Sequence, residues 1–361
     1  MSGWPEGREA ERVTVAQTWL LRFPYHREAA EGSRQAVDLI GVEVRTSGGA
    51  AGMGFTYSLN GGGRAVRSLI DECLLPAAIG RSREDRWQLW DELAWSTRRK
   101  GPGVTRLALS ALDIALWDAA ARASQVPLHA LLGNRRDRVP LFASGRFSAA
   151  LSAGARAVKL RIGGRPPAED ITRVRAVREA VGDAELMVDA AELLSFAEAS
   201  WLCPRLEALG VTCLEEPLAA EHIRQYQELR LRTSMAIAGG EHLYTRAQVL
   251  EYLRAEAVDV LNPDVAIVGG ITEFMRICEL ADAFGCRIAP HLVADLHVAI
   301  APAIPGLLHV ENFPFTQHLW EGGSIPGVCG GAAAPARTDP GHGLSLSQGY
   351  RRDLELGASH G

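Results

Sequence analysis

Several features that mark particular protein classes are missing from this sequence of 361 residues. It has no run of Lys and Arg, and its formal net charge of -5 comes from interspersed signs, which argues against nucleic acid or an anionic membrane as the main partner. No apolar run approaches the length of a membrane span, and the N-terminus lacks the cationic start and apolar stretch of a secretory signal. We therefore expect a cytoplasmic protein that acts on a small molecule.

Cysteine pairs and several common catalytic motifs are also missing. The six cysteines are scattered without a CxxC pair, as is typical of reduced core thiols. No GxSxG, HExxH or P-loop pattern occurs, which removes the usual signals for a serine hydrolase, a zinc protease or a nucleotide phosphatase. With 47% hydrophobic and 22% charged residues, the chain has ordinary globular composition, and its length predicts one large domain or two domains.

The first third of the chain has the pattern of an α+β domain. Residues 12–58 show β-branched alternation interrupted by polar and glycine-rich loops, which indicates a small antiparallel sheet. Helical spacing of apolar residues follows in residues 64–80, 83–99 and 104–125. The glycine-rich stretch 48–63 has no phosphate-binding context, and we interpret it as a flexible turn or capping loop.

From residue 139 to about 320, short apolar strands alternate with segments of helical spacing. Repeated strand–helix units predict a parallel sheet, because parallel neighbours need a crossover connection. Eight strands suit a closed barrel, although the strand count alone also permits an open, doubly wound sheet. The predicted strands are residues 139–144, 157–162, 184–190, 211–216, 235–241, 257–264, 286–291 and 307–312.

Reactive side chains near the ends of successive strands favour the barrel. In a barrel all such positions converge on one mouth, whereas an open sheet would spread them along an edge. These residues are Lys159, Asp189, Glu215, Glu241, Asp264, His291 and Glu311.

Three consecutive strand ends carry the acids Asp189, Glu215 and Glu241. Carboxylates brought together repel one another unless a cation neutralises them. Ligation by oxygen alone favours Mg²⁺ or Mn²⁺ over zinc. We therefore predict a Mg²⁺ site, while each acid taken alone could be an ordinary solvated residue.

The next two strand ends carry Asp264 and His291, which we expect in hydrogen-bond reach of each other. A carboxylate on one imidazole nitrogen fixes the tautomer and raises the basicity, which leaves the other nitrogen to move a proton. The pair therefore predicts a general acid/base dyad, with a buried structural histidine as the alternative.

Lys159 and Arg161 lie two apart on one strand, so both should point into the barrel beside the metal. They could bind a substrate carboxylate, and the charge of Arg161 should depress the pKa of Lys159. Glu311 could hydrogen-bond a developing enolate oxygen if it is held protonated, or it could be a structural acid.

A series of motifs in the sequence connects these residues: ALDIALWDAAARASQVPLHALLG, GARAVKLRIGG, LMVDA, LEEP, GGEH, NPD followed by IVGGIT, and APH. With these motifs, in this order, the sequence resembles the enolase superfamily, in its mandelate racemase-like branch. The resemblance implies a (β/α)₇β modified TIM barrel at residues 138–321, beneath an α+β capping domain formed by residues 1–137 and completed by a C-terminal tail at 322–361. It also implies the metal-ligand and dyad roles above, an electrophilic role for Glu311, and a homo-oligomer.

Two departures from the family pattern bear on the reaction. Racemases of the family have a second lysine, serving as a base opposite the histidine, where this chain has Arg161, and arginine is a poor proton abstractor. Relatives commonly have Asp-Ala-Asn after the first ligand, where this chain has Ala191 in place of the Asn, so a polar contact to the substrate is absent.

A single competent base favours dehydration of a sugar acid to a 2-keto-3-deoxy acid, through an enediolate that the metal and the cations stabilise. Racemisation or epimerisation of a 2-hydroxy acid is the second hypothesis and cycloisomerisation the third. The non-enzyme alternative is a catalytically silent barrel that only binds an acid.

Specificity should come from capping loops above the barrel. Their polar and aromatic groups suit a polyhydroxylated acid, although each could equally be surface or packing. The predicted substrate-binding residues are Arg22, Tyr25, His26, Phe55 and Tyr57.

Overall fold

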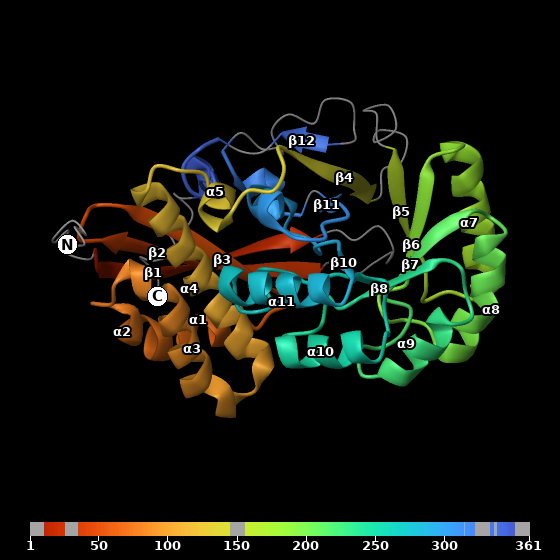
Figure 1. The fold of residues 1–361 in the computed structure, drawn as a ribbon, viewed down its shortest axis with the longest axis horizontal. Coiled ribbons are helices and arrows are strands. Elements are labelled where there is room, and N and C mark those ends of the chain that lie inside the picture. The colour runs from red at the N-terminus through yellow and green to blue at the C-terminus, as the bar shows by residue number, and fades with distance from the viewer. Residues whose placement is uncertain are drawn as a thin grey trace, which may run out of the picture.

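The protein consists of an antiparallel sheet with its helices, packed against a barrel of parallel strands, as seen in a computed structural model (Figure 1). The structure describes residues 11–25, 35–144, 156–313, 315–321, 333–335 and 338–350.

The first described elements are three antiparallel strands, β1 (Val13–Tyr25), β2 (Gln35–Thr46) and β3 (Ala51–Leu59). Side chains alternate between the two faces of a strand, and both faces of this sheet are covered. On β2, Val37 and Leu39 join the core shared with the barrel, whereas Ile40 and Val42 join a second core against the helices. The predicted antiparallel sheet is confirmed, and its two buried faces explain its apolar composition.

The helices that cover this sheet agree with the predicted helical spacing of residues 64–80, 83–99 and 104–125. The longest packs against β3 and β2. The helical elements are α1 (Gly63–Leu69), a π-helical turn (Ile70–Leu74), α2 (Leu75–Ala78), α3 (Arg86–Thr97), α4 (Pro102–Ala123) and α5 (Leu128–Leu132).

Strand β3 corrects the interpretation of residues 48–63 as a flexible turn or capping loop. A Cβ added at Gly54 would lie 2.2 Å from the carbonyl oxygen of Ala111, and one at Gly52 would lie 2.2 Å from that of Ala115. These glycines therefore permit the backbones of β3 and α4 to approach closely. Glycine in a strand normally signals a turn, so the sequence pattern was misleading here.

Eight parallel strands form the barrel, and the circle is closed by pairing of the last strand with the first. A bridge from Ile288 to Leu307 joins the final two strands. The structure thus confirms the closed barrel over the open sheet. The strands are β4 (Arg138–Ser144), β5 (Ala157–Arg161), β6 (Glu185–Asp189), β7 (Val211–Glu215), β8 (Ala236–Gly239), β9 (Val260–Leu261), β10 (Arg287–Ile288) and β11 (Val310–Asn312).

Helices connect the strands from β5 onward and cover the outside of the barrel (Figure 1). One begins with a capping box, in which Ser195 accepts from the backbone N–H of Glu198 and the Glu198 carboxylate accepts from that of Ser195. The helices are α7 (Pro167–Val181), α8 (Phe196–Glu207), α9 (Ile223–Arg230), α10 (Arg246–Arg254), α11 (Ile271–Ala283) and α12 (Ala294–Ile300).

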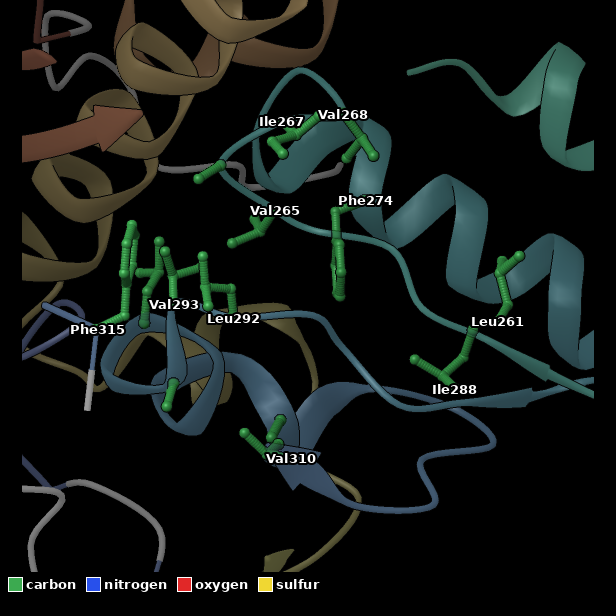
Figure 2. Close-up of a cluster of buried hydrophobic side chains, with 14 of the residues drawn as sticks. Leu261, Val265, Ile267, Val268, Phe274, Ile288, Leu292, Val293, Val310 and Phe315 are labelled. Carbon is green, nitrogen blue, oxygen red and sulfur yellow. The ribbon is translucent and has the colours of Figure 1, made fainter. Parts of the chain in front are cut away.

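Strand alternation separates an outer core from a small core inside the barrel. Leu261 and Ile288 lie side by side in the outer core, which also contains Phe274 of α11 (Figure 2). Inside, Met187 and Cys213 belong to an apolar cluster that also contains Phe142, Ala238, Val260 and Ala289. Two residues further along their strands, on the same face, come Asp189 and Glu215. The apolar layer therefore forms the floor beneath the charged mouth.

The C-terminal segment 338–350 packs back on the first part of the chain. The backbone N–H of His342 donates to Asp118 Oδ1 at 2.9 Å, and its Nε2 lies 2.7 Å from the carbonyl oxygen of Met53. A further strand, β12 (Ala333–Pro335), instead pairs antiparallel with β4 of the barrel. The domain boundaries at 137 and 321 stay predictions.

No helix in the described ranges is both long and apolar enough to cross a membrane. The five cysteines in those ranges are all free thiols, and four of them are buried. Cys329 lies outside the described residues.

Candidate active site

The seven reactive side chains predicted at strand ends meet at one mouth of the barrel. The structure confirms their positions, while their roles in catalysis and metal binding stay predictions. Each lies within three residues of the carboxyl end of its strand, from β5 to β11: Lys159, Asp189, Glu215, Glu241, Asp264, His291 and Glu311.

Lys159 bridges two buried acids. Its Nζ donates to Glu215 and lies 3.0 Å from Oε1 of Glu311. Burial alone would lower the pKa of Lys159, but the charges of Glu215, Glu311 and Asp189 outweigh it and raise the pKa well above its usual value. The expectation that Arg161 depresses this pKa is therefore wrong, because the surrounding carboxylates dominate.

Arg161 and Asp189 are register partners on the neighbouring strands β5 and β6. The Nη1 of Arg161 donates to Oδ2 of Asp189 at 2.9 Å, while the backbone N–H of Ala191 donates to Oδ1 at 2.8 Å. Ala191 has a φ of 39°, in the left-handed region that Asn adopts more easily than Ala. The departure at Ala191 thus removes a polar side chain and leaves some backbone strain.

Glu215 is a buried acid with two other acids close to it. Burial raises its pKa to about 7, and the charges of Asp189 and Glu311 add to this effect while Lys159 opposes it. A carboxylate in such surroundings is stable as an anion only beside a positive charge.

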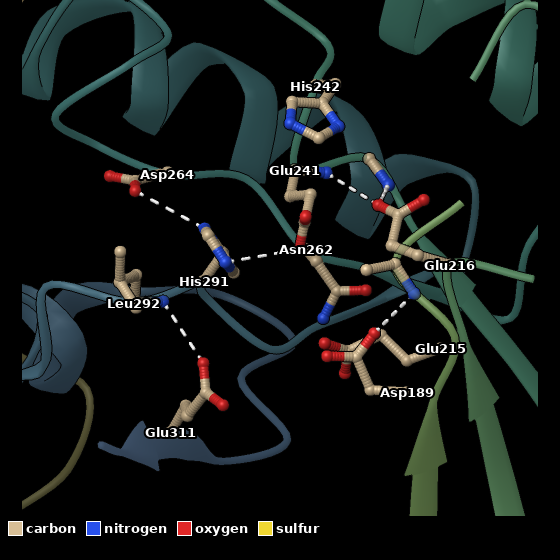
Figure 3. Close-up of polar contacts among 12 residues, drawn as sticks. Asp189, Glu215, Glu216, Glu241, His242, Asn262, Asp264, His291, Leu292 and Glu311 are labelled. Carbon is tan, nitrogen blue, oxygen red and sulfur yellow. Dashed lines mark hydrogen bonds and ion pairs between the residues drawn. The ribbon is translucent and has the colours of Figure 1, made fainter. Parts of the chain in front are cut away.

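His291 lies between two carboxylates (Figure 3). Its Nε2 is 3.1 Å from Oε2 of Glu241, and its Nδ1 is 3.5 Å from Oδ2 of Asp264. The structure therefore brings the predicted dyad together, although 3.5 Å is longer than a normal hydrogen bond. Asp264 is held by other groups: Oδ1 accepts from the backbone N–H of Ala266 at 2.7 Å, and Oδ2 accepts from the hydroxyl of Tyr57 at 2.7 Å.

The charge state of His291 follows from these neighbours. Burial alone would lower its pKa, but the negative charges of Glu241, Asp264 and Glu311 outweigh burial and raise the pKa to about 10. The imidazole is therefore held protonated by the anions around it.

Glu311 does not meet the condition that it be held protonated. Burial would raise its pKa, but Lys159 and His291 outweigh burial and lower it. Its Oε2 accepts from the backbone N–H of Leu292 at 3.3 Å. Glu311 is thus a carboxylate in this arrangement, and it helps to hold Lys159.

The predicted substrate-binding residues are divided among different environments. Arg22 and Phe55 lie in strands β1 and β3 rather than in capping loops; Arg22 makes a bidentate pair with Asp38, and Phe55 is fully buried against Trp320. Among these five residues, Tyr57 contacts the site, through Asp264. Tyr25 ends β1, and His26 lies outside the described residues. Their binding roles stay predictions.

Sequence reasoning missed Glu216, which is fully buried beside Glu215. Its Oε1 accepts from the backbone N–H groups of Gly240 and Glu241 at 2.6 and 2.9 Å, and its Oε2 lies 2.8 Å from the hydroxyl of Tyr226. Glu216 therefore fixes the backbone that carries Glu241 (Figure 3). The second Glu of the LEEP motif was the available signal.

Glu192 and His242 form a second unpredicted contact at the rim. Oε1 of Glu192 lies 3.2 Å from Nδ1 of His242 and accepts from the backbone N–H of Ala220 at 3.1 Å. The hydrogen bond that His242 donates to Glu192, helped by the charges of nearby carboxylates, outweighs burial and raises the pKa of His242. This contact links the loops that follow β6, β7 and β8.

The donor set at this mouth fits a hard divalent cation. Asp189 and Glu215 are register partners on adjacent strands, and all the donors are oxygens. Beside them, Oδ1 of buried Asn262 has no hydrogen-bond partner among the described residues, and a hydrated cation would satisfy such an acceptor. Within those same residues, no three His, Cys, Asp or Glu side chains converge closely enough for one ion, and Lys159 and Arg161 pair with Glu215 and Asp189.

Comparison with known proteins finds two family models that cover most of the chain. Residues 9–133 match the mandelate racemase / muconate lactonizing enzyme N-terminal domain, and residues 145–350 match the enolase C-terminal domain-like model.

Individual relatives match over nearly their whole length. The 3,6-anhydro-alpha-L-galactonate cycloisomerase of Streptomyces coelicolor is 32% identical over 93% of this chain and 96% of its own. The arabinonate dehydratase of Saccharolobus solfataricus is 30% identical over 95% of this chain and 94% of its own. Among solved structures, L-talarate dehydratase from Polaromonas sp. JS666, complexed with Mg and L-glucarate, superposes with a TM-score of 0.87 at 32% identity, covering 95% of this chain and 97% of that one.

Proposed function

The chain belongs to the mandelate racemase / muconate lactonizing enzyme family of the enolase superfamily, and we propose that it is a Mg²⁺-dependent dehydratase of acid sugars. In this proposal the enzyme removes the proton next to a substrate carboxylate and expels the β-hydroxyl, which yields a 2-keto-3-deoxy acid. The observation that carries the proposal is the presence of one histidine dyad at a mouth whose other cations, Lys159 and Arg161, are both paired with acids.

Asp189, Glu215 and Glu241 would hold the metal in this proposal. Bound Mg²⁺ would neutralise these carboxylates, offset the negative charge that raises the pKa of His291, and withdraw electrons from the substrate carboxylate. The solved relative complexed with Mg and L-glucarate supports both the metal and the substrate class.

His291 serves as the base. Its Nε2 faces the acids in the mouth while Asp264 lies on the side of Nδ1, so a substrate beside Glu241 would present its α-proton to Nε2. The C–H bond breaks, and its electron pair moves into the carboxylate to form an enediolate. When that pair returns, the β C–O bond breaks, the proton from His291 leaves with the hydroxyl as water, and the resulting enol becomes a ketone.

Lys159 and Arg161 stabilise the negative charge that develops on the substrate. Both are held in place by acids, so neither must reorganise during the reaction. Arg161 is a poor base, and the ammonium group of Lys159 is tied to Glu215 and Glu311, so neither is placed to serve as the second base that a racemase needs. This disfavours racemisation or epimerisation.

Cycloisomerisation is the second candidate, because the cycloisomerase of S. coelicolor matches this chain over nearly its full length. It would use the same proton transfer by His291 and differ in the bond that breaks at the β-carbon. The choice between the two reactions depends on the substrate.

A screen of pentonates, hexonates, aldarates and their anhydro and lactone forms tests the proposal. The enzyme is incubated with Mg²⁺ in deuterated solvent and the products are followed by NMR. A 2-keto-3-deoxy acid formed with loss of water supports dehydration, a ring-opened or rearranged isomer formed without loss of water supports cycloisomerisation, and inversion with deuterium uptake supports racemisation. Absence of turnover and of α-deuterium exchange across the whole set would refute the enzymatic proposal.

A further inference from the structure

The dyad is completed by a residue from the other part of the molecule. Tyr57 lies on β3 of the antiparallel sheet, and its hydroxyl donates to Oδ2 of Asp264 at 2.7 Å across 207 positions of sequence. Tyr57 is 4% exposed and Asp264 is 0% exposed. A hydrogen bond to a buried carboxylate is strong, and its loss leaves the carboxylate undersatisfied.

The contacts of Asp264 show what orients this carboxylate. Oδ1 accepts from the backbone N–H of Ala266 at 2.7 Å, and Oδ2 accepts from Tyr57. Nδ1 of His291 is 3.5 Å from the same Oδ2, which is longer than either bond. The plane of the carboxylate is therefore set by Ala266 and Tyr57, and His291 meets an acceptor already oriented.

Tyr57 is itself fixed. Its ring packs edge-on against Phe315 with centroids 5.1 Å apart, and β3 pairs with β2 through Leu39. The neighbouring residue, Thr56, donates from Oγ1 to the carbonyl oxygen of Ala266 at 2.6 Å and is fully buried. The position of the Tyr57 hydroxyl thus depends on how the antiparallel sheet docks on the barrel.

We propose that Tyr57 is a positioning residue for the histidine dyad. Its hydroxyl holds Asp264 so that Oδ2 faces Nδ1 of His291, which keeps the proton on Nδ1 and leaves Nε2 free to act on the substrate. The inference rests on the proposed function of His291 as the base. It replaces the predicted substrate contact of Tyr57 with a role through Asp264.

Two substitutions at the same interface separate this role from simple docking. Tyr57→Phe removes the hydroxyl on Asp264 and keeps the ring against Phe315. Thr56→Val removes a hydrogen bond of similar length and burial that does not touch Asp264. Both variants lose one buried hydrogen bond between the sheet and the barrel, so we expect them to lose similar thermal stability. A difference in kcat between them then reports on Asp264 rather than on docking of the sheet.

The experiment measures kcat, KM, Mg²⁺ affinity and thermal unfolding with the acid sugar that wild type turns over fastest in the screen. For Tyr57→Phe we expect kcat to fall about 10- to 100-fold, as for other groups that orient a functional side chain, with KM and Mg²⁺ affinity unchanged. Thr56→Val should keep kcat within about twofold of wild type. Its unfolding temperature should drop by about as much as that of Tyr57→Phe. A Tyr57→Phe enzyme with wild-type kcat, or an equal loss of kcat in both variants, would overturn the inference.

His291→Asn distinguishes this failure from failure of the proposed function. If wild type exchanges the α-proton, His291→Asn does not, and Tyr57→Phe equals wild type, the positioning role alone is wrong. If wild type and His291→Asn both lack exchange, the proposed function fails and the positioning role fails with it.

Discussion

The guanidinium group of Arg161 lies 2.9 Å from the carboxylate of Asp189, its register partner on the next strand. In family racemases this strand position supplies a second base, and here it supplies a fixed positive charge bound to a predicted metal ligand. In the proposed mechanism this pairing makes the two faces of a bound substrate chemically unequal, with a base on the His291 side alone.

Arg161→Lys should therefore give the enzyme some ability to epimerise the α-carbon. A lysine can take and return a proton where arginine cannot, and a placed general base contributes about 100-fold or more. We expect inversion with deuterium uptake to become detectable in Arg161→Lys by NMR in deuterated solvent. Arg161→Met, which has no base, is the control, and equal behaviour of the two variants would contradict this explanation.

Glu216 should control metal affinity through the backbone of Glu241. The hydroxyl of Tyr226 lies within hydrogen-bond reach of both Glu216 and the carbonyl oxygen of Leu218, and one hydroxyl proton cannot serve both acceptors. A Gln at position 216 can donate to Tyr226 and still accept from the backbone N–H groups of Gly240 and Glu241.

We therefore expect Glu216→Gln to bind Mg²⁺ within about threefold of wild type and Glu216→Ala to bind about 10- to 100-fold more weakly. Isothermal titration calorimetry with Mg²⁺ measures both, and circular dichroism verifies that each variant is folded. Similar affinities for the Gln and Ala variants would show that Glu216 does not position Glu241.

The positions of most strands and of the charged mouth could be predicted from sequence. The packing of β3 on α4 and the side-chain pairings at the mouth could not. Asp189 and Glu215 end short apolar strands, so strand alternation and parallel topology place them together without further information. Strand β3 was missed because Gly52 and Gly54 suppress the strand signal; their purpose is the close approach to α4, which only the structure shows. Local patterns do not reveal such long-range packing.

Pairings inside the mouth were also beyond sequence reasoning. The pKa of Lys159 depends on which charges surround it in three dimensions, and the acids outnumber Arg161 there. Tyr57 and Asp264 are separated by 207 positions, so no spacing rule connects them. The missed contacts of Glu216 arise from the shape of the loop after β8, which strand and helix periodicity does not describe.

The glycines that allow β3 to approach α4 provide a stability test. An Ala at position 54 would place its Cβ 2.2 Å from a helix carbonyl, so Gly54→Ala should lose about 1–3 kcal/mol or more of unfolding free energy. Gly103, inside α4, has open space around its Cβ position, so Gly103→Ala should gain about 0.5–1 kcal/mol. Urea unfolding measures both, and a neutral Gly54→Ala would show that β3 and α4 can move apart easily.

Asp113 of α4 should make stability depend on pH. Burial raises its pKa to about 7, although bonds from Thr272 and the charges of Arg86 and Arg276 act in the opposite direction. In the unfolded chain the pKa of Asp is about 4, so the folded state binds the extra proton between these values. The stability that Asp113 contributes is present below about pH 4 and is lost as pH rises through 7, at no more than about 1.4 kcal/mol per pH unit.

Asp113→Asn cannot ionise, so its unfolding free energy should fall less steeply than that of wild type between pH 5 and pH 7. Urea unfolding at pH 5, 6 and 7 gives the two slopes, and the difference between them removes the contribution of other titrating groups. Parallel slopes would mean that Asp113 does not take up a proton on folding.

The central claim is that His291 removes the α-proton of an acid-sugar carboxylate with the help of bound Mg²⁺. The most direct measurement is the rate of α-deuterium incorporation into the best substrate in deuterated solvent, for wild type with Mg²⁺, wild type with EDTA, and His291→Asn with Mg²⁺. Exchange or turnover in the first sample alone, with His291→Asn still binding Mg²⁺, is the predicted result. Undiminished exchange in His291→Asn or in EDTA would contradict it.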